Sequence, residues 1–81
     1  MKIMLQSTTK IVELVTDKGS VVPARVWEGT TESGIPVHCF VTRLAPTIPV
    51  GDPRQREFQE QLQECEAPTT DVASYPLRMI L

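Results

Sequence analysis

The chain is short of the residues with which small proteins usually build stabilising cross-links. It has two cysteines, Cys39 and Cys65, and neither stands in a CxxC or cysteine–histidine spacing. This pattern predicts neither a disulfide framework nor a zinc site, so we expect two free, buried thiols. A domain of 81 residues has a small core, and without cross-links or metals such domains often depend on oligomerisation. The sequence therefore favours one domain over residues 1–81 that forms a homo-oligomer.

Charge of one sign and long apolar runs are also missing. Eight Lys and Arg residues against ten Asp and Glu residues give a net charge of −2, and no basic cluster of the kind that binds nucleic acid is present. No apolar run approaches the roughly 18 residues of a membrane span, and the N-terminus lacks the apolar core of a signal peptide. We expect a soluble cytoplasmic protein that binds neither long nucleic acids nor membranes.

Residue patterns for catalysis are absent as well. His38 is the only histidine, and no serine or cysteine with an orienting carboxylate accompanies it, as nucleophilic catalysis requires. Its neighbour Cys39 would point to the opposite face of a strand. Glu57, Glu60 and Glu64 have a helical spacing that is typical of a solvated face. We predict no catalytic residue, no metal and no cofactor; an enzyme using His38 would need a nucleophile or a metal from another protomer.

What the sequence does contain is a β-rich N-terminal half. Residues 3–5 and 10–16 predict strands, and the polar residues 7–9 between them predict a bulge or a bend. Residues 17–20 (DKGS) predict a turn, with Gly19 at a position suited to a positive φ.

The next two expected strands, residues 21–28 and 35–44, are the most informative part of the chain. The polar loop 29–34 (GTTESG) joins them, and we align them with Val26 opposite Val37. A shift of two residues would keep the same faces, because side chains alternate along a strand. This alignment places aliphatic and small side chains on one face. On the other face it collects Arg25, Trp27, His38 and Phe40, with Pro36 opposite Trp27.

The C-terminal half predicts one helix and one strand. Asp52 is a suitable N-cap, and residues 54–65 lack glycine, proline and β-branched residues. The apolar stripe of this helix is narrow and consists of Phe58, Leu62 and Cys65. Residues 75–81 predict a last strand whose core-facing side chains are Leu77, Met79 and Leu81. The fold class is α+β, a four- to five-stranded, mainly antiparallel sheet with one helix packed on one face. We expect that face to be the aliphatic one.

The face that this helix leaves open is the candidate binding surface. Trp27 could stack on a base or another flat ring, or fill an oligomer seam. Arg25 could capture a phosphate or a carboxylate, or form a salt bridge, whereas Arg43 falls on the aliphatic face. The loop could wrap an anion with its N–H groups and hydroxyls, or be an ordinary hairpin loop. The candidate ligand-binding residues are Arg25, Trp27, Glu28, Gly29, Thr30, Thr31, Ser33, Gly34 and His38. The candidate oligomer interface is Trp27, Pro36 and Phe40.

The segment RVWEGTTESGIPVHCFVTR, residues 25–43, resembles small proteins carried by phages and mobile elements. The resemblance covers about residues 7–44 and 76–81, carries the pattern Arg-x-Trp-Glu-Gly-x-Thr-x-x-Gly, and points to no named family. Compact proteins of this class commonly act by binding: they block a host protein or sequester a small molecule, including nucleotide signals of bacterial immunity. The resemblance thus implies a binding function.

These observations together predict a non-enzymatic, homo-oligomeric binding protein. It would bind or sequester a small anionic, nucleotide-like ligand near the Trp27 face, since small-molecule sites favour interfaces. The alternative is an inhibitor or adaptor that docks the same face on a host protein, with Trp27, Arg25 and Phe40 as anchors.

Overall fold

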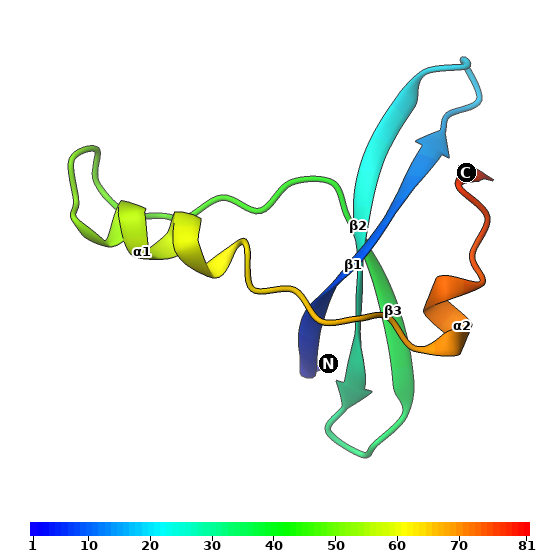
Figure 1. Cartoon of the computed structure of the whole chain (residues 1–81), viewed down its shortest axis with the longest axis horizontal. Coiled ribbons are helices and arrows are strands. Elements are labelled where there is room, and N and C mark those ends of the chain that lie inside the picture. The colour runs from blue at the N-terminus through cyan, green and yellow to red at the C-terminus, as the bar shows by residue number, and fades with distance from the viewer.

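The computed structural model describes residues 1–81 as four strands and two helices (Figure 1). The elements are β1 (Ile3–Val15), β2 (Val21–Thr31), β3 (Pro36–Val41), α1 (Arg54–Gln61), α2 (Thr70–Ala73) and β4 (Arg78–Ile80). The strand order is β3-β2-β1-β4, with β4 parallel to β1 and the other neighbours antiparallel. The predicted class is confirmed: α+β, with a mostly antiparallel sheet and one longer helix.

β1 joins the two strands expected in the N-terminal half into one element of 13 residues. Its register against β2 shifts between Ser7 and Ile11, which confirms the predicted irregularity. On the other edge of β1, the chain returning from α1 pairs with this segment: the Glu66 N–H donates to Ser7 O (3.0 Å), and the Thr9 N–H donates to Glu66 O (2.9 Å). The predicted turn follows β1, with Gly19 at φ 80°.

The register of β2 and β3 differs from the predicted one. Trp27 lies opposite Cys39, and Val26 lies opposite Phe40, a shift of three residues from our alignment. Because three is odd, every β3 side chain changes face relative to β2. The predicted grouping of His38 and Phe40 with Trp27 on one face is therefore wrong.

The turn between the two strands explains the shift. The Thr31 N–H donates to Ile35 O (2.9 Å), so the loop contains three residues rather than the six from Gly29 to Gly34. Gly34 takes a φ of 90°, as the last residue of a three-residue hairpin loop usually does. Gly29 and Thr30 belong to β2.

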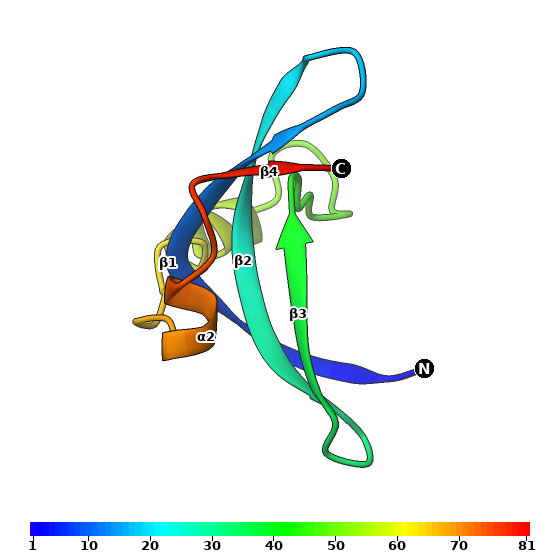
Figure 2. The ribbon, with the colours of Figure 1, turned by 90° about the vertical axis from the view of Figure 1, so that its right-hand side faces the viewer.

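The sheet separates two sides of the molecule, with α1 on one side and α2 on the other (Figures 1 and 2). We call the side bearing Val12, Ala24 and Val26 the core face, and the side bearing Arg25 and Trp27 the cleft face. The prediction that the longer helix covers the aliphatic face is wrong: α1 lies over the cleft face, and the short segment that contains α2 covers the core face. The chain itself thus covers part of the Trp27 side.

The core is thin and lies entirely on the core face. One polar residue belongs to it: the buried Thr8 hydroxyl donates to Val26 O (2.7 Å) and accepts the Lys10 N–H (3.2 Å). Its apolar members are Val12, Leu14, Ala24, Val26 and Val72, bordered by Phe40, Tyr75 and Met79. Of the three side chains expected to point inward from the last strand, only Met79 does so, whereas Leu77 and Leu81 are 72% and 74% exposed.

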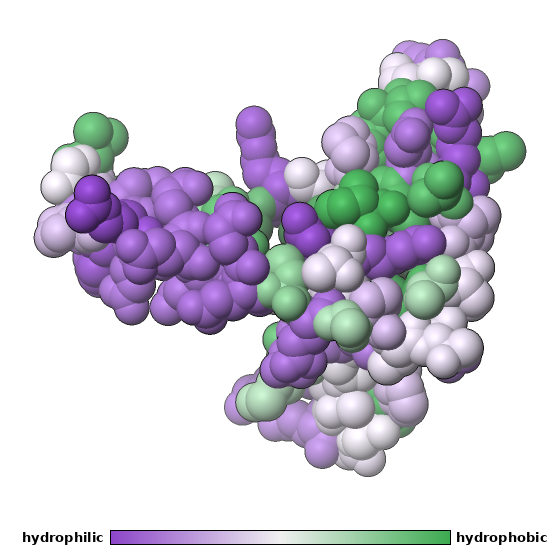
Figure 3. Space-filling model, viewed as in Figure 1, coloured by the Kyte–Doolittle hydropathy of each residue, from purple (hydrophilic) through white to green (hydrophobic).

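The segment of residues 42–65, which we call the arm, carries α1 away from the sheet and is mostly hydrophilic (Figure 3). α1 spans eight residues, ends at Gln61 and buries none of its side chains. Just before its start, Asp52 Oδ1 accepts the Arg54 N–H (2.8 Å), but the N-cap residue is Pro53 rather than the predicted Asp52. Arg54 also lowers the pKa of Asp52, first through the side-chain hydrogen bond and then through this N–H. Neither helix is long and apolar enough to cross a membrane.

Candidate functional site

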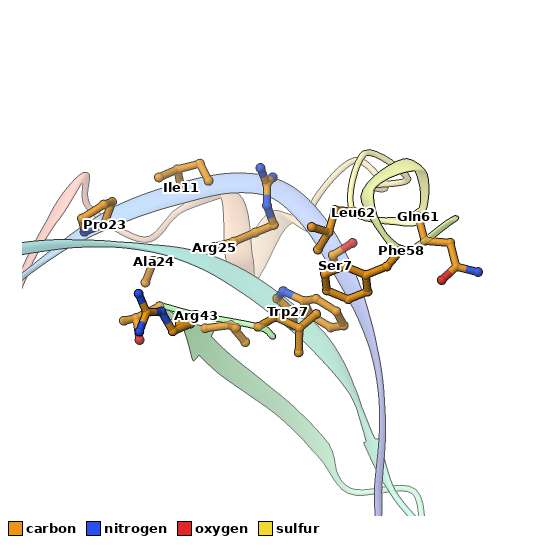
Figure 4. Close-up of a pocket in the computed structure, with 13 residues that line it drawn as sticks. Ser7, Ile11, Pro23, Ala24, Arg25, Trp27, Arg43, Phe58, Gln61 and Leu62 are labelled. Atoms are coloured by element: carbon orange, nitrogen blue, oxygen red, sulfur yellow. The ribbon is translucent and has the colours of Figure 1, made fainter. Parts of the chain in front are cut away.

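A concavity lies between the cleft face and the arm (Figure 4). It has a volume of about 420 Å³. Three strands and the arm contribute to its walls, which consist of Ser7, Ile11, Pro23, Ala24, Arg25, Trp27, Val41, Thr42, Arg43, Leu44, Phe58, Gln61 and Leu62. More than half of these residues are apolar, and none carries a carboxylate. We call this concavity the cleft.

Strand alternation places the functional side chains of the cleft. Arg25 and Trp27 are two residues apart on β2, so both point to the same face. The observed register puts Val41 directly opposite Arg25, and Arg43, two residues further along, returns to the same side. The predicted register had placed Arg43 on the aliphatic face. Arg43 is therefore the one charged residue of the cleft that the prediction assigned to the wrong face.

Arg25 is held in place by the irregular part of β1. Its Nη1 donates to Thr8 O at 2.8 Å, and the side chain is half-buried. Guanidinium has five N–H donors in a planar fork, so this contact fixes the group while leaving donors for a ligand. No carboxylate of the chain pairs with Arg25, so the salt bridge to Glu28 or Glu32 considered as its alternative role is not formed.

Arg43 is the second cation of the cleft. It is exposed and takes part in no ion pair and no side-chain hydrogen bond of the structure. Two guanidinium groups and no carboxylate line the cleft, so its walls carry a positive charge although the whole chain carries −2. Such a site attracts anions.

Aromatic side chains form the other wall. Trp27 projects from β2, and Phe58 projects from α1 toward it (Figure 4). Leu62 lies beside Phe58, so the narrow apolar stripe of α1 faces the indole of Trp27. We had predicted that this stripe would face the aliphatic core. These groups offer flat apolar surface next to the two arginines.

Two predicted ligand residues have structural roles on the core face. The His38 Nδ1 is 2.8 Å from the Tyr75 hydroxyl, and the two rings meet edge to face. The Glu28 carboxylate accepts the Thr69 N–H (3.2 Å) and hydroxyl (3.3 Å), which anchors the start of α2. The structure does not bring either residue to the cleft.

Phe40, expected beside Trp27 in an oligomer seam, also lies on the core face, where it meets Tyr75 edge to face. Pro36 opens β3 opposite Thr30, three residues along β2 from Trp27. The three residues proposed as one interface therefore do not form one continuous surface.

The loop residues lie at the far end of the β2–β3 hairpin. Thr30 and Thr31 line a separate hollow with Lys2 and Glu32. The Thr31 hydroxyl is 3.2 Å from that of Ser33 and accepts the Ile35 N–H, so it stabilises the turn. The Thr31 and Ser33 hydroxyls are therefore engaged locally, and no residue of the loop lines the cleft.

Gly29 and Gly34 have conformational roles in this hairpin. A Cβ on Gly29 would lie 1.8 Å from Met4 O, because β1 passes very close to β2 here. Gly34 has the positive φ of the turn. Glycine at both positions is explained by packing and turn geometry rather than by an anion.

The remaining chemistry of the chain is sparse. No group of three His, Cys, Asp or Glu side chains is arranged to hold a metal ion. Both cysteines are free, as predicted, but only half-buried. Cys65 Sγ lies 3.5 Å from the Ser7 hydroxyl oxygen at the root of the arm.

Comparison with known proteins adds no family: no family model matches the chain, and no curated protein or solved structure is similar to it.

Proposed function

We propose that this chain is a non-enzymatic binding protein that takes a small anionic, nucleotide-like ligand into the cleft. The observation that carries the proposal is the composition of its walls. Trp27 and Phe58 stand beside Arg25 and Arg43 in one concavity, and no carboxylate competes for the two cations. That combination suits a molecule with a flat ring at one end and a negative charge at the other.

The dimensions of the cleft support a ligand of this size. A volume of about 420 Å³ falls within the roughly 300–1,000 Å³ of most small-molecule sites. Stacking of a base on an aromatic side chain contributes about 1–3 kcal/mol. Trp27 is half-buried, so its ring is already oriented by the sheet and still presents surface to the cleft.

The two arginines have different tasks in this proposal. Arg25 is fixed by Thr8 O and acts as a preorganised anchor for an anionic group, since guanidinium matches the geometry of phosphate and carboxylate. Arg43 is unpaired and exposed, so it can move to complete the contact when the anion arrives.

The biological role that fits such binding is sequestration. The chain resembles small phage proteins, and some proteins of that class sequester nucleotide signals of bacterial immunity. A chain that has a cleft but no arrangement of catalytic side chains suits that role. The alternative, docking of the Trp27 face on a host protein, has less support. The arm makes this surface concave, and Phe40, one of its expected anchors, lies on the core face.

The test is isothermal titration calorimetry with a panel of nucleosides and of mono-, di- and cyclic nucleotides. We expect measurable heat for at least one nucleotide and weaker binding of the corresponding nucleoside, which lacks the phosphate. Trp27→Ala should weaken binding by roughly 5- to 150-fold through the loss of stacking. Arg43→Gln should weaken it by roughly 10- to 100-fold, because a hydrogen bond to a charged group contributes about 1.5–3 kcal/mol.

Two matched variants control for effects unrelated to the cleft. Arg56→Gln removes the same charge from an exposed position on α1 that does not line the cleft. His38→Gln alters the core face only. Both should bind like the wild type. Absence of heat for every nucleotide would refute the proposal, and equal affinity for a nucleoside and its nucleotides would refute the role of the arginines.

A further inference from the structure

The molecule exposes much more surface than a chain of its size should. Its accessible area is 6305 Å², whereas a folded monomer of 9.0 kDa is expected to expose about 4,850 Å². Its radius of gyration is 14.5 Å, against roughly 12 Å for a compact chain of this length. The excess area exceeds the roughly 800 Å² that each partner buries in a standard interface. A partner could therefore cover a full interface on this chain.

The two edges of the sheet are unequally protected. β4 is three residues long and carries Arg78, whose guanidinium pairs with Glu13 (3.2 Å). Short length and charge are the usual protection of an edge strand. β3 is six residues long, lies at the other end of the strand order and contains no Asp, Glu, Lys or Arg. No other strand pairs with its outer edge.

The hydrogen-bonding groups of that edge can be assigned from the turn. Because the Thr31 N–H donates to Ile35 O, the odd-numbered residues of β3 point their main-chain groups toward β2. His38 and Phe40 then point theirs outward, and no main-chain hydrogen bond outside the strand ladders involves either residue. Pro36, which has no N–H to offer, occupies the only other outward position of β3.

We infer that β3 pairs antiparallel with β3 of a second copy, with Cys39 on the two-fold axis. This register is the one in which His38 of one chain exchanges hydrogen bonds with Phe40 of the other, twice by symmetry. Val37 then lies opposite Val41 of the second copy. A two-fold axis requires that the same surface of both copies is self-complementary. Because β3 contains no charged residue, two copies of it can pair without like-charge repulsion.

The resulting dimer has one continuous eight-stranded sheet. A two-fold axis perpendicular to the sheet keeps both clefts on the same face, because Cys39 lies opposite Trp27 on the cleft side. The dimer is independent of the proposed ligand: the edge groups that form it belong to the main chain of β3 and line no part of the cleft, apart from the last residue, Val41.

The register makes Cys39 a specific reporter. Facing residues of a non-hydrogen-bonded antiparallel pair have Cα atoms about 4.5 Å apart, within the roughly 4.4–6.8 Å that a disulfide spans. Treatment of Cys65→Ser with a mild copper(II) oxidant should join the two Cys39 thiols of a dimer. Two protons are released and two electrons pass to the oxidant, and a reductant should restore single chains. Cys39→Ser, which keeps Cys65 in the arm, is the matched control and should remain uncross-linked.

Sedimentation of the wild type gives an independent readout. We expect the wild type to sediment with twice the 9.0 kDa chain mass. Cys39→Lys places two positive charges opposite each other on the axis, so it should sediment as single chains. Cys39→Ser should remain a dimer. Circular dichroism of Cys39→Lys shows whether the single chain is still folded. A wild type that sediments as a monomer at all concentrations would overturn the inference. A dimer whose Cys39 cross-links no faster than Cys65 would overturn the register.

Discussion

The two faces of the sheet are covered by segments with helices of different length, and the segment with the shorter helix buries the sheet more completely. The core face is sealed by a segment whose helix has four residues, yet Val12, Val26 and Val72 are completely inaccessible. The cleft face is covered by a helix of eight residues that buries none of its side chains. Helix length therefore does not decide how well a face is sealed.

Anchoring explains the difference. The core-face segment is attached at both ends to β1: Glu66 bonds to Ser7 and Thr9, and the Glu13 N–H donates to Leu77 O (2.7 Å). The arm is also attached at both ends, to β3 and through Glu66 to β1, but its only other hydrogen-bonding contacts with the sheet are those of the Ser7 side chain near its return. The core-face segment is held along its length as well, by Glu28 at Thr69 and by His38 at Tyr75. It therefore packs closely, whereas the arm leaves a cleft beneath it.

The sharpest test of this comparison truncates one aliphatic side chain on each side. Val26→Ala removes part of a fully buried side chain, so it should lower the free energy of unfolding by about 2–3 kcal/mol. Leu62→Ala, on the arm, should lower it by less than about 1 kcal/mol, as is usual for partly exposed positions. Urea unfolding at one fixed protein concentration measures both. Equal losses would show that the arm packs as tightly as the core.

The same comparison shows what the sequence could predict and what it could not. The alternation of β1, the turn at Gly19 and the start of α1 follow from local residue patterns, and all three were predicted correctly. The faces of β3 depend on the length of one loop. Reading the loop as six residues, from Gly29 to Gly34, instead of three placed His38 and Phe40 on the wrong side.

A local signal for the correct register was present. Gly34 at the third position of a three-residue loop is a familiar hairpin pattern, and it would have grouped Arg43 with Trp27 and Arg25. The side on which α1 lies had no such signal. Its stripe of Phe58 and Leu62 is equally compatible with either apolar face, and the choice is made by where the chain returns to β1 at Glu66.

A second pair of variants compares polar contacts on the two sides. Thr8→Val keeps the shape of a buried side chain but leaves Val26 O and the Lys10 N–H without their partner. We expect a loss of about 1–3 kcal/mol in unfolding free energy, the usual cost of a buried unsatisfied group. Ser7→Ala breaks a more exposed hydrogen bond to Glu64 O and should cost about 0.5 kcal/mol. Denaturant unfolding that ranks Ser7→Ala above Thr8→Val would contradict the two-face description.

The smallest effect concerns pH and the arm alone. Arg54 and the N–H at the start of α1 hold the pKa of Asp52 below its ordinary value, so folding of this turn favours the ionised carboxylate. The stabilisation is fully present above the pKa of the unfolded chain, about 3.9, and is lost as the pH falls through the lower pKa of the folded state. The protection factors of the amides of residues 54–61, taken relative to the intrinsic exchange rate at each pH, should therefore fall between pH 5 and the acid limit, while those of Val12 and Val26 stay high. Asp52→Asn retains an acceptor oxygen but has no charge to titrate, so this step should disappear in it. If the step persists in Asp52→Asn, another carboxylate controls the arm. If Val12 loses protection in the same step, the arm and the core unfold as one unit, and the two faces do not differ in the way proposed.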